Sequence, residues 1–110
     1  MGATTLDLYR AGNASSAKLD ILRPHEVDTF QRNGATWVRA HTGGSSTLES
    51  PDLLFGGKWW RLAAGSTYDD KLLLVFRDQG NHWLWEPAQD MPRSDYISAL
   101  QDVNGLFVRV

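Results

Sequence analysis

The chain has 110 residues, a length typical of one domain that buries roughly 65% of its unfolded surface. It contains no cysteine, which excludes disulfides and thiolate metal sites, and its three histidines are too widely spread to predict a zinc site. The formal net charge is −2 and the basic residues are scattered, so no global basic field favours nucleic acid or acidic membranes.

Hydropathy predicts no membrane attachment. No apolar run approaches the ~18 residues that a membrane-spanning helix needs. The first residues lack a basic stretch followed by an apolar block, so no secretory signal is visible. If the protein leaves its cell, we expect it to use another route.

The first predicted element is a strand over residues 4–10. Apolar and polar residues alternate there, which places Leu6, Leu8 and Arg10 on one face. We expect residues 11–13, Ala-Gly-Asn, to end this strand.

A hairpin follows. Residues 27–32 and 35–41 read as two strands, and Asn33-Gly34 between them is a strong two-residue turn signal. Residues 42–47 are rich in glycine and hydroxyl side chains, which predicts a flexible polar loop, and residues 50–55 permit a short helical turn.

The second half of the chain predicts four strands and the one clear helix. The strands are expected over residues 58–62, 72–77, 82–87 and 106–110. Residues 72–77 are almost continuously apolar, which favours a fully buried central strand. An apolar stripe predicts the helix over residues 92–103, with its end at Asn104-Gly105. The predicted fold class is therefore α+β with a mainly antiparallel sheet.

The strand over residues 82–87 carries the most unusual pattern. Alternation places His82 and Glu86 on one face, and Trp83 and Trp85 on the other. An imidazole and a carboxylate on one face, backed by two tryptophans, are candidates for chemistry. The plain alternative is a structural histidine and a solvated glutamate.

Two further features admit a functional and a plain interpretation. Arg10 can recognise a carboxylate or a phosphate pair through its guanidinium fork, or it can form an ordinary strand-end ion pair. The loop Gly43-Gly44-Ser45-Ser46-Thr47 can bring the backbone close to a ligand, or it can be an ordinary polar loop. It is not a Walker loop, because no Gly-Lys-Ser/Thr ends it.

Five segments in order support a family resemblance. They are Leu8-Tyr9-Arg10-Ala11, His41-Thr42-Gly43-Gly44-Ser45-Ser46-Thr47-Leu48, Arg61-Leu62-Ala63-Ala64-Gly65, Lys71-Leu72-Leu73-Leu74 and His82-Trp83-Leu84-Trp85-Glu86-Pro87-Ala88-Gln89-Asp90-Met91-Pro92. Over nearly the whole chain this arrangement resembles the type VI secretion exported toxins with an ADP-ribosyltransferase fold. The Leu-Tyr-Arg opening, the Gly-Gly-Ser-Ser loop and the His-aromatic-x-x-x-Pro-Ala-x-x-Met segment are its most specific parts.

The resemblance implies one ADP-ribosyltransferase-like domain over residues 1–110, with a split, mainly antiparallel sheet and one or two short helices. It also implies NAD as a substrate without a metal, and a toxin that acts in the cytoplasm of the producing or the target cell. The implied partner is a cognate immunity protein or antitoxin.

The resemblance further implies roles for individual residues. The implied catalytic residues are Glu86, His82 and Ser46, and the implied NAD-binding residues are Arg10, Ser45, Ser46, Thr47, Trp60 and Trp83, with Trp59 as another candidate for stacking on nicotinamide. Because the position of Glu86 is not always acidic in this toxin family, His82 is the stronger candidate of the two.

Cleavage of NAD fits these residue types. Nicotinamide leaves as a neutral base, so the chemical need is to stabilise an oxocarbenium-like ribose, which a carboxylate can do. Transfer to an acceptor and transfer to water both remain open. The alternative is a non-enzymatic module that binds a sugar or a peptide in a tryptophan-lined groove. Convergence of Arg10, Ser46 and Glu86 in space would favour the enzyme.

Overall fold

The computed structural model describes residues 1–110 except 24, 52–56 and 78–80. The helix α1 spans Arg93–Asn104. The strands are β1 Gly2–Ala3, β2 Leu8–Gly12, β3 Thr29–Arg32, β4 Ala35–Val38, β5 Ser45–Leu48, β6 Lys58–Leu62, β7 Thr67–Tyr68, β8 Leu72–Arg77, β9 His82–Pro87, β10 Met91–Pro92 and β11 Val108–Arg109. Every strand pair within the described residues is antiparallel, which confirms the α+β class with a mainly antiparallel sheet.

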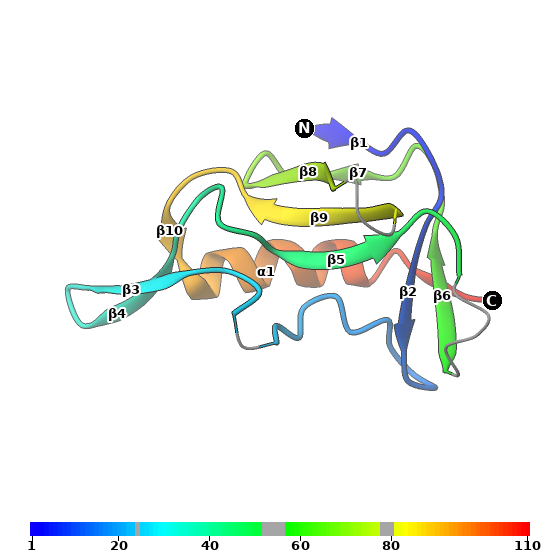
Figure 1. The fold of residues 1–110 in the computed structure, drawn as a ribbon, viewed down its shortest axis with the longest axis horizontal. Helices are drawn as coiled ribbons and strands as arrows, with labels where there is room; N and C mark the ends of the chain where they lie inside the picture. Colours follow the sequence, from blue (N-terminus) through cyan, green and yellow to red (C-terminus); the bar gives the residue numbers. More distant parts are fainter. Residues whose placement is uncertain (24, 52–56, 78–80) are drawn as a thin grey trace.

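The largest sheet has six strands in the order β11-β6-β2-β5-β9-β8. Its two halves meet at a narrow junction, because β2 and β5 pair through Tyr9 and Leu48 alone. Figure 1 shows β5, β9 and β8 side by side, with β2 and β6 running across their direction. The ladder of hydrogen bonds therefore nearly breaks between β2 and β5.

A second sheet, in the order β10-β4-β3, carries the projecting hairpin on the left of Figure 1. Asn33 and Gly34 both have positive φ, 52° and 77°, as a two-residue turn with right-handed strand twist requires. The predicted hairpin is confirmed, although each strand is shorter than expected. Phe30 and Trp37 pair across it with ring centroids 6.0 Å apart.

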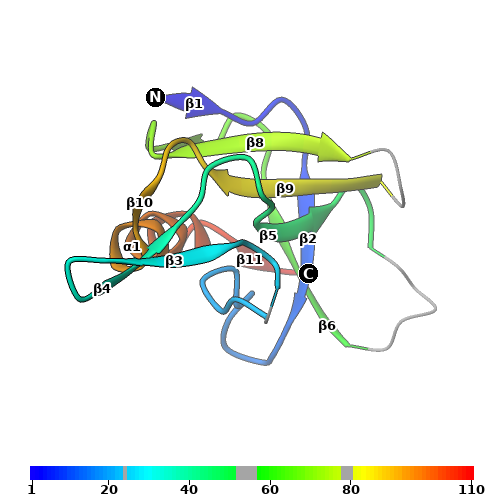
Figure 2. The ribbon, with the colours of Figure 1, turned by 60° about the vertical axis from the view of Figure 1, so that its left-hand side comes forward.

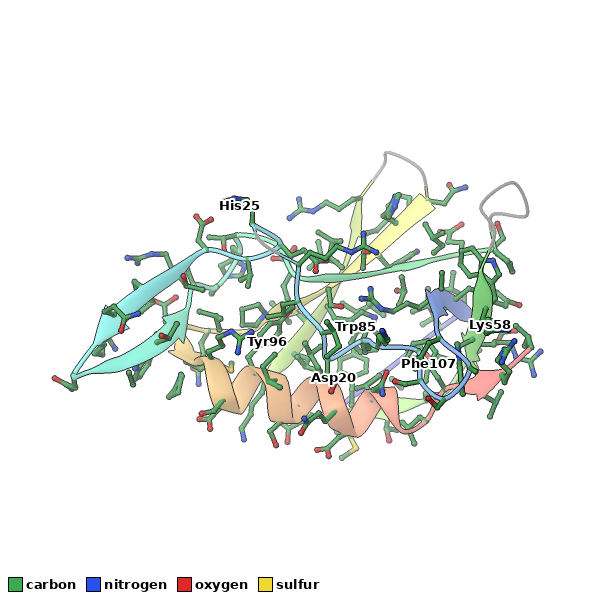
Figure 3. The ribbon with its side chains drawn as sticks, turned by 90° about the horizontal axis from the view of Figure 1, so that it is seen from below. Asp20, His25, Lys58, Trp85, Tyr96 and Phe107 are labelled. Carbon is green, nitrogen blue, oxygen red and sulfur yellow. The ribbon has the colours of Figure 1, made fainter. Side chains whose placement is uncertain are left out.

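The core lies between α1 and the large sheet. Figure 3 shows Trp85 and Tyr96 in this layer, and Leu8, Leu62 and Leu100 are buried with them. Each such side chain contributes about 1.5–3 kcal/mol when it is removed from water. Trp85 is thus one of the largest side chains that the fold buries completely.

Several predicted elements are wrong in extent or position. The first strand begins at Leu8 and continues through Gly12, because Ala11 and Gly12 pair with β6 instead of forming a turn. Residues 45–48 are a strand inside the sheet, whereas a loop was expected over residues 42–47. The expected last strand is short, Val108–Arg109.

The apolar run over residues 72–77 was expected to be a central strand, and this prediction is wrong. It forms β8, the edge of the large sheet, beyond β9 in Figure 2. Leu73 is 39% exposed and Phe76 is 42% exposed. Local hydropathy alone did not distinguish an edge from a centre.

The helix prediction is confirmed within one residue at each end. Pro92 occupies the N-cap position and makes no side-chain capping bond. Most of the helical turn expected over residues 50–55 lies outside the described residues. Within the described part of the chain, no helix is long and apolar enough to cross a membrane.

Candidate functional site

A pocket of about 210 Å³ opens at the junction of β2 and β5. Its lining residues are Tyr9, Arg10, Ala11, Arg23, Ser46, Leu48, Trp59 and His82. Tyr9 and Leu48 are the residue pair that joins the two halves of the sheet. The pocket therefore lies where a single residue pair joins the two halves of the sheet.

Arg10 is a structural link and a pocket residue at once. Its side chain is 8% exposed, and three of its N–H groups donate to backbone carbonyls: Nε to Ala17 at 3.1 Å, Nη1 to Ser46 at 2.6 Å and Nη2 to Lys18 at 3.0 Å. A guanidinium has five N–H donors, so two lie outside these bonds. Burial lowers the pKa of Arg10, and the negative charge of Glu26 opposes that shift.

Positive charge and aromatic rings dominate the pocket. Arg10, Arg23 and His82 can each carry positive charge, and Tyr9 and Trp59 supply rings. None of the described residues that line it is acidic. This combination suits a ligand with anionic oxygens and a planar ring.

Alternation along β5 separates the three hydroxyl residues. Ser45 and Thr47 are fully buried, and their hydroxyls donate to the carbonyls of Leu19 at 2.7 Å and Trp83 at 3.0 Å. Thr47 also accepts the indole N–H of Trp85 at 3.2 Å. Of the three, Ser46 lies at the pocket.

Glu86 shares the β9 face of His82 but does not line the pocket. Four residues along a strand span about 13 Å. The Glu86 side chain is 1% exposed, and its carboxylate accepts a hydrogen bond from Nη2 of Arg77 at 2.8 Å. The structure thus brings Arg10, Ser46 and His82 together and leaves Glu86 outside the group.

The tryptophans divide in the same way. Trp60 donates its indole N–H to the carbonyl of Asn13 at 2.9 Å. Trp83 donates to Glu49 at 2.9 Å and packs on Phe76 with centroids 5.1 Å apart. Neither lines the pocket, whereas Trp59 does. Trp59 and Trp60 differ because adjacent residues of β6 point to opposite faces.

The paired glycines before β5 serve the chain's own packing. A Cβ at Gly43, where φ is 126°, would meet the carbonyl oxygen of Glu26, and one at Gly44 would meet the backbone of Trp85. The close approach that glycine permits here is to protein backbone.

Arg23 is a pocket residue that sequence reasoning did not single out. It follows β2 in an irregular segment with no periodic pattern, so no local signal placed it beside Arg10. In the described part of the chain, no group of three histidine, cysteine, aspartate or glutamate side chains could hold a metal ion. Comparisons with models of protein families and with curated proteins find no match.

Proposed function

We propose that this chain is an NAD-consuming toxin domain of the ADP-ribosyltransferase-like fold, acting as a transferase or as an NAD glycohydrolase. One observation carries the proposal: Arg10, Ser46 and His82, which the resemblance implied as site residues, line one pocket where β2 meets β5. They lie far apart in sequence, and the strand order β2-β5-β9 brings them to one place.

The pocket supplies the binding groups that NAD needs. Arg10 and Arg23 can hold the diphosphate, and the ring of Trp59 can stack on nicotinamide. A dinucleotide exceeds this space, since ligand pockets usually measure about 300–1,000 Å³. The proposal therefore places the nicotinamide half in this pocket.

His82 is the proposed proton acceptor. The bond between ribose C1′ and the nicotinamide nitrogen breaks, and its electron pair leaves with the neutral base. The acceptor oxygen, or water, bonds to C1′ and gives up a proton, which an imidazole at the pocket can take. Glu86 is assigned no contact with NAD, because it is paired with Arg77.

The direct test is release of nicotinamide from NAD by the purified chain, followed by chromatography. His82→Gln should lower the rate about 100-fold, the effect expected from loss of a general base. His41→Gln provides the control, because His41 is exposed and does not line the pocket. Equal rates for the two variants, with both folded, would remove His82 from the mechanism.

A cellular test addresses the toxin role and its partner. Expression in the cytoplasm of a bacterium should deplete NAD and stop growth, and a co-expressed cognate immunity protein or antitoxin should restore both. Growth arrest at constant NAD would contradict the proposed chemistry.

A non-enzymatic binding module is the second candidate. The absence of a carboxylate among the described lining residues favours it, because nothing there compensates a developing positive charge on ribose. Its expected ligand is a sugar or a peptide. NAD binding without nicotinamide release, together with tighter binding of such a ligand, would select this function.

A further inference from the structure

A second hollow, of about 440 Å³, shares the lining residue Arg23 with the first. Its lining residues are Leu22, Arg23, His25, Val27, Asp28, Thr29 and Arg93. Their volumes added together fall within the range of about 300–1,000 Å³ that is usual for ligand pockets.

The second hollow has more basic than acidic groups in its lining. The lining contains three basic residues, Arg23, Arg93 and His25, and one carboxylate, Asp28. The ion pairs between described residues involve neither arginine. A nearby carboxylate, Glu26, accepts the backbone N–H of Arg23 and does not line the hollow.

Arg93 is placed where it does not help the helix. It is the first residue of α1 and is exposed. A positive charge at this end of a helix opposes the macrodipole. The helix dipole therefore does not favour an arginine at this position, and an anion bound beside it would offset the repulsion.

We infer that the second hollow takes the adenosine half of the dinucleotide and selects a form that carries an additional phosphate on its ribose. This inference rests on the proposed function. In the proposed function, Arg10 and Arg23 bind the diphosphate. The adenosine half of NAD carries no other charge. Arg93 and His25 are then left to bind a further phosphate, as an arginine beside the ribose does in sites for NADP. The apolar side chains of Leu22 and Val27 can pack on the adenine ring.

The test is calorimetric binding of NADP and NAD to the full chain and to Arg93→Gln. NADP should bind the native chain about tenfold more tightly, the value of one hydrogen bond between charged groups. Arg93→Gln should bring the two affinities close together by weakening NADP alone, without lowering the melting temperature. Arg32→Gln is the matched control, because Arg32 is an exposed arginine on β3 outside both hollows, stacked 4.4 Å from the ring of Trp37.

Equal affinities of the native chain for NADP and NAD would overturn the inference, as would a preference that Arg93→Gln leaves intact. If neither dinucleotide binds, the proposed function fails, and the second hollow is then tested by itself with 2′,5′-ADP and 5′-AMP. Tighter binding of 2′,5′-ADP that Arg93→Gln abolishes supports the phosphate site. No preference between these two ligands refutes it.

Discussion

Replacement of Arg10 by methionine should destabilise the fold by about 3 kcal/mol. The change removes three charge-assisted bonds to carbonyls, each worth about 1.5–3 kcal/mol. Part of this sum is recovered, because the buried guanidinium no longer needs to be desolvated. A net loss of about 3 kcal/mol is a large share of the 5–15 kcal/mol typical of a domain.

Urea unfolding followed by tryptophan fluorescence measures this loss. With a slope of about 1–3 kcal/mol per molar urea, the midpoint should fall by about 1–3 M. Arg23→Met is the control, because Arg23 is exposed at the same pocket and its replacement should change stability by less than about 0.5 kcal/mol. A loss below about 1 kcal/mol for Arg10→Met would refute the structural role. Loss of the proposed NAD cleavage in an Arg10 variant is evidence for a role in catalysis only where the variant remains folded.

Three further predictions concern stability. Burial raises the pKa of Tyr96 above its usual value near 10, so the folded state disfavours ionisation and the free energy of unfolding should decrease as the pH rises above about 10. Urea unfolding at pH 8 and pH 11 should show a smaller decrease for Tyr96→Phe than for the native chain. Arg77→Ala should lower the free energy of unfolding by about 1–2 kcal/mol, because it leaves the buried carboxylate of Glu86 unpaired. A double-mutant cycle with Glu86→Gln should show coupling between the two residues, and additive effects would show that the ion pair is weak. Gly44→Ala should cost more than about 2 kcal/mol in a thermal melt, because its Cβ would overlap the backbone of Trp85, and an unchanged melting temperature would contradict this packing.

Local patterns predicted the parts of the fold that local chemistry determines. Asn33-Gly34 specifies its turn through two positive φ angles, and the stripe that includes Tyr96 and Leu100 specifies a helix. Alternation in β9 correctly separated His82 from Trp85. In each case the deciding interactions lie within a few residues in sequence.

The remainder depends on strand order, which local sequence does not encode. Residues 45–48 look like a loop until β9 and β2 lie on either side of them. Residues 72–77 look central, yet no strand within the described residues pairs with their outer side. The candidate site was predictable at Arg10, Ser46 and His82, whereas Arg23 enters the pocket through an irregular segment.

The single pair Tyr9–Leu48 gives the molecule a seam with little backbone bonding across it. A compound that binds residues on both sides of this junction would stabilise the folded state, and its binding should raise the melting temperature of the chain. Small molecules can therefore be screened by the increase in melting temperature that they cause, before any reaction is known.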